Sequence, residues 1–227
     1  MLKTYVRDVT PQMLQKIFDT LGHTPSARRH LIIFTKSVFA YAQKLGLIDK
    51  SPVASFSLRK PIPRERVLTE SELKDLWHSS ASETLTTMLR LMILTGQRRG
   101  EIQHLTLDGD IAHLKAEHSK NKKSHLFPVG PLAIELLTHD RKYTNWHGGK
   151  PSLAPGMPHW TYHDLRRTFA TIHAQIGTPP YIIERTLNHT AGSLSPIALT
   201  YNRFKYMDEM REAMHKYEAH ILKIVEQ

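Results

Sequence analysis

The sequence predicts a mainly α-helical chain with one small antiparallel β-sheet. Apolar residues recur at helical spacing over several long stretches. Capping residues and glycines stand at the ends of these stretches, as they do at the ends of helices. One segment near the middle of the chain has instead the pattern of a strand, a turn and a second strand. Hydrophobic residues make up 40% of the 227 residues, which is enough for a sizeable core.

The first clear helix is expected from about Pro25 to Leu45. Thr24 suits its N-cap and Pro25 its first position, while Gly46 suits a left-handed residue just after its end. Five apolar residues at helical spacing are expected to face a core: Leu31, Phe34, Val38, Tyr41 and Leu45.

A basic linker is expected at residues 60–66, Lys-Pro-Ile-Pro-Arg-Glu-Arg. Its two prolines favour an extended backbone, and three of its residues are basic. The linker divides the chain into a small helical part at residues 1–59 and a larger domain at residues 67–227.

The larger domain opens with two helices. Thr69 and Glu72 have the spacing of a capping box and start the first helix. The second is expected from Thr84 to Thr95, with Gly96 at its C-terminal end. Four apolar residues at helical spacing are expected to face the core: Leu85, Met88, Leu89 and Met92.

A hairpin follows, with arms at Ile111–His118 and His125–Val129 and a turn around Asn121. The remaining elements are expected to be helices: Leu132–Thr138, Tyr162–Gln175, Pro180–Leu187 and Lys205–Val225. The last helix carries an apolar stripe that runs from Met207 to Val225. This stripe either docks on its own domain or contacts other copies of the chain.

The charge of the chain favours an anionic partner. The formal net charge is +10, and nucleic acid is the first polymer to consider for such a charge. The absence of Cys excludes disulfides and cysteine-ligated zinc. The start of the chain has no apolar signal core, and the apolar run Leu91–Leu94 is too short to cross a bilayer. We therefore expect an intracellular protein with no membrane partner.

Four local patterns in a fixed order carry the candidate chemistry. They are Thr95–Ile102 with Arg98, the lysine cluster Lys120–Lys123, His163–Ala170 with Arg166, and Leu187–His189 followed by Tyr201–Arg203. Each alone has an ordinary structural explanation. Arg98 could pair with Glu101 or Glu72 at the surface, and a lone Tyr is more often a core aromatic. His159 and His163 are spaced like metal ligands, but no carboxylate triad or Cys supports a metal site, and none is expected.

Taken together, these patterns resemble the tyrosine recombinases, especially the integrases of phages and genomic islands. The resemblance covers nearly the whole chain and implies a helical core-binding domain at residues 1–59, joined by the linker to a catalytic domain at residues 67–227. The N-terminal part resembles only the later portion of a core-binding domain. The two domains of family members clamp double-stranded DNA.

The resemblance also implies a reaction. Tyr201 is expected to attack a DNA phosphodiester, which leaves a 3′-phosphotyrosine bond and a free 5′-hydroxyl. Arg98 and Arg166 match the family's two phosphate-binding arginines, since guanidinium stays charged and donates paired hydrogen bonds to phosphate. This cationic set makes a metal ion unnecessary, and no cofactor or ATP is expected.

The remaining catalytic positions concern protons. Lys120 best matches the family's hairpin lysine, the general acid for the leaving 5′-oxygen, and Lys122 and Lys123 remain rivals. His163 matches a residue that assists proton transfer at the tyrosine, and His189 matches one that donates a hydrogen bond to the phosphate. Glu101 is expected to buttress an arginine or to cap a structural element, with no direct chemical part.

A further set of basic residues is assigned to the DNA backbone or to surface ion pairs. These residues are Arg28, Arg29, Lys36, Lys60, Arg64, Arg66, Arg99, Lys122, Lys123 and Arg167. Arg99 and Arg167 each adjoin a matched arginine, and adjacent helix positions do not share a face. They are therefore not expected to share the catalytic role.

The resemblance implies a tetramer on two DNA sites and leaves open a role for accessory DNA-bending proteins. We expect the protein to be cytoplasmic and associated with the nucleoid. Two other functions remain as alternatives. A type IB topoisomerase uses similar residues and the same covalent link. A DNA-binding regulator derived from a recombinase needs no catalysis, and would not need to keep all the matched residues.

Overall fold

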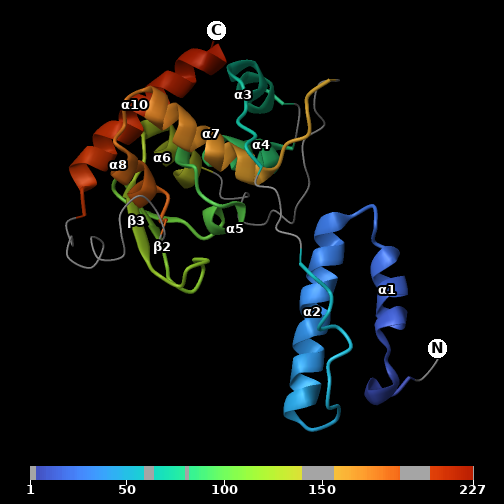
Figure 1. The fold of residues 1–227 in the computed structure, drawn as a ribbon. Helices are drawn as coiled ribbons and strands as arrows, with labels where there is room; N and C mark the ends of the chain where they lie inside the picture. Colours follow the sequence, from blue (N-terminus) through green and yellow to red (C-terminus); the bar gives the residue numbers. More distant parts are fainter. Residues whose placement is uncertain (1–3, 59–63, 80–81, 140–155, 190–204, 227) are drawn as a thin grey trace. The chain divides into compact units, whose positions relative to one another are not determined.

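The computed structural model describes residues 4–58, 64–79, 82–139, 156–189 and 205–226. The chain forms two compact units, Met1–Arg64 and Glu65–Gln227, which are called here the N-terminal and C-terminal units (Figure 1).

The N-terminal unit contains a short 3-10 helix, η1 (Val6–Asp8), and the helices α1 (Pro11–Asp19) and α2 (Pro25–Lys44). The Thr10 hydroxyl caps α1 by accepting a hydrogen bond from the backbone of Met13 at 3.3 Å. The core between the helices is small and consists of Leu14, Phe18, Ile32, Phe39 and Val53.

Helix α2 has the expected bounds within one residue, but the predicted core-facing stripe is wrong. Phe34 is 66% exposed and Tyr41 is 62% exposed, whereas Ile32 and Phe39 are buried. Apolar residues line two adjacent faces of this helix, and α1 packs on the face that holds Ile32 and Phe39. The expected Thr24 cap is also wrong in detail, because its hydroxyl donates to the Leu21 carbonyl instead of accepting from the helix.

The C-terminal unit is mainly helical with one small sheet, as the sequence predicts. Its helices are α3 (Glu70–Trp77), α4 (Glu83–Thr95), α5 (Arg99–Ile102), α6 (Pro131–Thr138), α7 (Tyr162–Gln175), α8 (Pro180–Thr186) and α10 (Met207–Glu226). Helix α4 contacts α3, α5, α6, α7 and α10, and its residues lie at the centre of the main core (Figure 1).

The end of α4 is set by Gly96, which has a left-handed φ of 63°. A Cβ atom at this position would lie 2.6 Å from the Phe169 ring of α7. Glycine is thus required both by the backbone conformation and by the close approach of α7. This packing brings the residues that follow α4 next to α7 and to the end of α8.

The sheet has three antiparallel strands in the order β1 (Thr106–Asp108), β2 (Ile111–Leu114) and β3 (His125–Pro128). Leu114 pairs with His125 at the end of the hairpin. The first arm is therefore shorter than predicted, and residues 115–124 form the connection. Strand β1 was not expected from the sequence.

Helix α10 docks on its own unit through its apolar stripe. Met210, Met214 and Ile221 are buried, and the Tyr217 hydroxyl donates to the Ile93 carbonyl of α4 at 2.9 Å. Of the two alternatives for this stripe, packing within the domain is the one observed. In the described part of the chain, no helix combines the length and apolar character that a membrane crossing requires.

Candidate functional site

Arg166 lies at the centre of the candidate site, on α7. Its side chain is buried, and its Nη1 donates to the Gly96 carbonyl at 2.9 Å, while Nη2 donates to the Leu187 carbonyl. Burial, followed by the nearby charge of Arg98, lowers the pKa of Arg166 to about 9, so it remains cationic at neutral pH. One guanidinium therefore joins the ends of α4 and α8. Its Nε is buried and has no hydrogen-bond partner among the described residues.

Arg98 stands at the N-cap of α5, two residues after Gly96. Its Nη1 donates to Oε1 of Glu101 at 3.0 Å, and its side chain is 27% exposed whereas that of Glu101 is 4% exposed. The same Oε1 accepts a hydrogen bond from the backbone N–H of Lys120 at 3.2 Å. Glu101 thus buttresses Arg98, as predicted, and also attaches the hairpin turn to the arginine.

The three candidate lysines lie in this turn, and all are exposed. Lys122 has a left-handed φ of 58°, and its Nζ donates to the Glu117 carbonyl at 3.4 Å. Among the described contacts, Lys120 is the one lysine of the three whose backbone N–H donates to Glu101, the residue that also pairs with Arg98.

His163 and His189 lie within the electrostatic field of the two arginines. Burial and then the charge of Arg167, with contributions from Arg166 and Arg98, lower the pKa of His163. The pKa of His189 is lowered by burial and then by Arg166 and Arg98. His163 precedes Arg166 by one helical turn, and His189 follows the end of α8. Both imidazoles are therefore mostly neutral at pH 7.

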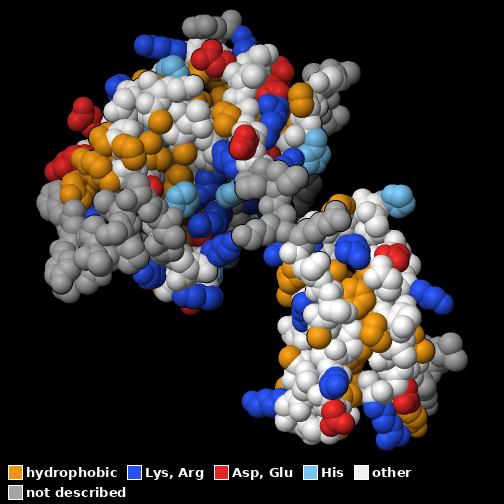
Figure 2. Space-filling view, in the orientation of Figure 1, with side chains coloured by type: hydrophobic (Ala, Val, Ile, Leu, Met, Phe, Trp, Pro, Cys, Tyr) orange, Lys and Arg blue, Asp and Glu red, His pale blue; other side chains and the backbone are white. Residues whose placement is uncertain are grey.

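His125 is a site residue that the sequence reading missed. It is buried on β3, and its Nε2 donates to the Thr186 carbonyl at 2.9 Å. Burial lowers its pKa to about 4; the hydrogen bond to Thr186 and the charge of Glu101 oppose this shift, and the charges of Arg166 and Arg98 add to it. The only available signal was its inward position in an alternating strand arm, which also fits an ordinary core residue. Figure 2 shows Lys, Arg and His side chains gathered on one face of the C-terminal unit.

The arginines beside the matched ones make other contacts, as expected from their positions. Arg167 forms an ion pair with Asp164 at 2.5 Å. The Arg99 guanidinium lies 5.5 Å from the centre of the Tyr162 ring. Neither contact involves Arg98 or Arg166.

The other basic residues assigned to DNA are spread over the two units. Arg66 pairs with Glu72 and donates to the Val67 carbonyl at 2.9 Å, and Arg28 lies 3.9 Å from Asp19. Arg29 and Lys36 are partly exposed on α2, and Arg64 is exposed at the end of its unit. Two of the predicted residues lie outside the described part of the chain: Lys60 and Tyr201, the expected nucleophile.

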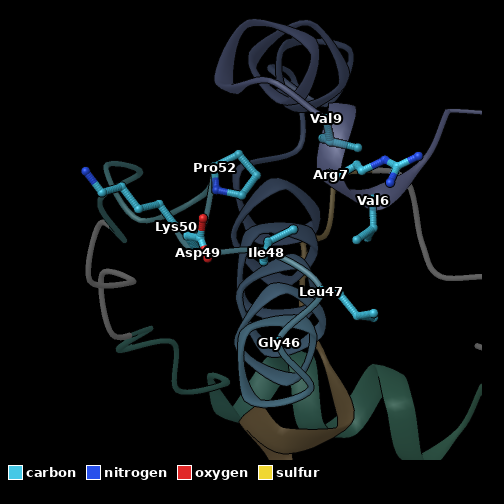
Figure 3. A pocket seen from close by; sticks show the side chains of 9 residues that line it. All are labelled: Val6, Arg7, Val9, Gly46, Leu47, Ile48, Asp49, Lys50 and Pro52. Atoms are coloured by element: carbon cyan, nitrogen blue, oxygen red, sulfur yellow. The ribbon is translucent and has the colours of Figure 1, made fainter.

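A separate hollow of about 520 Å³ lies in the N-terminal unit, between η1 and the segment after α2. Two cationic residues line it, Arg7 and Lys50, and Figure 3 shows their side chains extending away from each other. These charges do not converge on a common ligand, so the candidate site remains the arginine cluster of the C-terminal unit.

The fold of this chain resembles that of integrases in solved structures, and its sequence is similar to that of a curated integrase, which confirms the predicted resemblance. The prophage integrase IntF of Escherichia coli strain K12 is 24% identical over 234 residues, which cover 88% of this chain and 49% of that protein. The chain therefore spans about half the length of this curated relative. No family model matches the sequence.

Solved structures show the same fold. A lambda integrase fragment, residues 75–356, solved as a dimer bound to a COC′ core site, superimposes with a TM-score of 0.62 at 15% identity, covering 86% of this chain and 84% of that chain. The Tn1549 transposon integrase in complex with circular intermediate DNA gives a TM-score of 0.52 at 16% identity, covering 93% and 86%.

Proposed function

We propose that this chain cleaves and rejoins duplex DNA as a site-specific recombinase of the integrase type. The observation that carries the proposal is the joining of three sequence-distant motifs at one place. Arg166 contacts the end of α4, Arg98 follows it, and the Arg98 partner Glu101 holds the backbone of Lys120. These are the motifs whose order resembles the tyrosine recombinases.

Arg98 and Arg166 supply positive charge for a scissile phosphate. A phosphodiester is anionic, and charge on its non-bridging oxygens must be stabilised as the transition state forms. Arg98 is partly exposed and held by a buried carboxylate, so its guanidinium is oriented before DNA arrives. Loss of one such preorganised donor typically lowers a rate by ~10²-fold or more.

The proposed step conserves the ester bond. The Tyr201 oxygen attacks phosphorus, forming a P–O bond to tyrosine as the P–O5′ bond breaks. Because an unperturbed tyrosine phenol has a pKa of about 10, attack at neutral pH needs a base, and we assign the Tyr201 proton to neutral His163. Lys120 gives a proton to the departing 5′-oxygen, and His189 donates a hydrogen bond to the phosphate. Attack by a 5′-hydroxyl reverses the step, so neither ATP nor a metal ion is required.

We further propose that both units contact DNA and that the working assembly is a tetramer on two sites. The N-terminal unit contributes the basic residues of α2 as a core-binding domain, and residues 60–66 act as the basic linker. A lambda integrase with the same fold has been solved as a tetramer bound to a Holliday junction. Accessory DNA-bending proteins remain compatible with this assembly.

A plasmid assay distinguishes this function from its alternatives. Two copies of the junction sequence that flanks the gene in its genome would be placed on one supercoiled plasmid. We expect recombinant circles from the wild-type protein and none from Arg98→Ala. Relaxation without recombinants would indicate a topoisomerase, and DNA binding without either product would indicate a regulator.

A further inference from the structure

The hairpin turn that carries Lys120 has a second attachment besides the hydrogen bond to Glu101. It is formed with Asn188, just after α8. Asn121 Nδ2 donates to Oδ1 of Asn188 at 3.0 Å and approaches the Asn188 carbonyl at 3.3 Å. Asn188 Nδ2 in turn lies 3.5 Å from the hydroxyl of Ser119. The two residues that flank Lys120 are therefore both connected to Asn188.

The turn is also organised internally around the same amide. The Ser119 hydroxyl donates to Oδ1 of Asn121 at 2.6 Å, and the Lys123 backbone N–H donates to that oxygen at 3.1 Å. The oxygen of Asn121 thus holds the turn together, while its nitrogen reaches across to Asn188. Ser119 is 2% exposed, which shows that this contact is well packed.

Asn188 has an unusual backbone conformation, with a left-handed φ of 51°. Asn tolerates this region better than most residues other than glycine. It lies directly between α8 and His189, and the Leu187 carbonyl before it accepts from Arg166. Arg166 therefore holds this backbone independently of the Asn188 side chain, which makes Asn188 a fixed point for the hairpin turn.

We propose that Asn188 is a positioning residue that latches the hairpin turn, through Asn121, to the turn that carries His189. This inference rests on the proposed function. Glu101 fixes the backbone of Lys120 from the Arg98 side, and the Asn121–Asn188 latch fixes it from the His189 side. The exposed Lys120 side chain is otherwise unconstrained by the described contacts. The latch thereby fixes the position of Lys120, the proton donor for the leaving group, relative to His189, the hydrogen-bond donor for the phosphate.

Asn188→Gly is the direct test, because glycine accepts the left-handed backbone but lacks the amide. Single-turnover cleavage would be measured on a nicked duplex with an ordinary 5′-oxygen, and on the same duplex with a 5′-bridging sulfur. We expect ~10-fold slower cleavage of the oxygen substrate, since a small misplacement of a catalytic group lowers rates strongly. The sulfur leaving group needs no proton, so its cleavage should stay within about twofold of wild type.

The partner variant Asn121→Ala and the double variant complete a cycle. If the two amides act as one latch, the double variant should be no slower than the slower single variant. Ser124→Ala is the matched control, because it removes the 3.0 Å contact to His113 in the same hairpin but does not touch Asn188. The control should cleave at the wild-type rate.

Two results would overturn the latch. One is an unchanged rate for Asn188→Gly on the oxygen substrate. The other is equal slowing on both substrates, which would mean that Asn188 acts elsewhere than on the leaving group. If wild-type protein cleaves neither substrate, the proposed function itself is wrong, so the two failures are distinguishable.

Discussion

The backbone N–H of Lys120 donates to Oε1 of Glu101 at 3.2 Å, and this oxygen also accepts from the Arg98 guanidinium at 3.0 Å. A single buried carboxylate therefore fixes two groups that the proposed reaction uses. Glu101→Ala should slow single-turnover cleavage by ~10- to 100-fold, because both groups lose their orientation. DNA affinity should fall much less.

Glu117→Ala is the control for this variant. Its carboxylate belongs to the same connection between β2 and β3 and is 67% exposed beside His118. Its removal should leave the cleavage rate unchanged. Equal rates for Glu101→Ala and wild type would contradict the role given to Glu101.

Lys120→Ala should reduce cleavage far more than it reduces DNA binding. A general acid acts in the transition state, whereas a phosphate contact acts in both the bound and the transition state. A 5′-bridging sulfur in the substrate should restore the rate of this variant. If sulfur restores the cleavage rate of Lys122→Ala or Lys123→Ala but not that of Lys120→Ala, the proton donor is the residue whose variant is restored.

His173 should make the folded protein sensitive to acid. It is buried against Tyr217, with ring centres 4.3 Å apart, and burial lowers its pKa to about 3. The unfolded chain binds this proton below about pH 6.5, but the folded protein does so only near pH 3, so stability is lost as the pH falls between these values. The loss is about 1.4 kcal/mol per pH unit within this window.

His173→Phe keeps an aromatic ring against Tyr217 and removes the titrating group. Urea unfolding at pH 7 and pH 5 should show about 2 kcal/mol less acid destabilisation in this variant than in wild type. His139→Gln, at an exposed position, should behave as wild type. An identical acid response in His173→Phe would show that this imidazole does not control it.

Glu218 should stabilise the docking of α10. Its buried carboxylate accepts from the backbone N–H groups of Leu132 at 2.7 Å and Ala133 at 3.2 Å, at the start of α6. Glu218→Ala leaves these donors unpaired and should lower the free energy of unfolding by about 2 kcal/mol.

Gly130→Ala tests the same contact from the other side, since a Cβ atom there would lie 2.4 Å from the Glu218 carboxylate. Gly130 has an ordinary φ of −76°, so its backbone tolerates alanine. The substitution should destabilise the wild type but cost little in the Glu218→Ala background, as urea unfolding can measure. Additive losses would argue against this packing.

Local signals were sufficient where the sequence prediction succeeded. Helix α7 has the predicted bounds, and its start is set by Asp164, which accepts from the Thr161 backbone at 2.7 Å in a capping contact between near neighbours. Gly96 was predicted to end α4 because its left-handed conformation depends on its own lack of a side chain. The Arg98–Glu101 pair likewise joins residues one helical turn apart.

Long-range packing decided what the sequence could not. Helix α2 has two apolar faces, and only the position of α1 determines that Phe39 is buried while Phe34 is exposed. His125 enters the site through the carbonyl of Thr186, far away in sequence. The Asn121–Asn188 contact also joins separate motifs, and no spacing rule links a hairpin turn to a helix end.

Covalent trapping of DNA on Tyr201 tests the central claim most directly. A nicked suicide duplex, which loses the 5′-hydroxyl needed for reversal, should trap wild-type protein in a detergent-resistant complex. Tyr201→Phe keeps the ring but lacks the nucleophilic oxygen, so it should bind the duplex and give no complex. Tyr206→Phe, five residues away, should still give it. A complex that persists in Tyr201→Phe but disappears in Tyr206→Phe would contradict the assignment of the nucleophile.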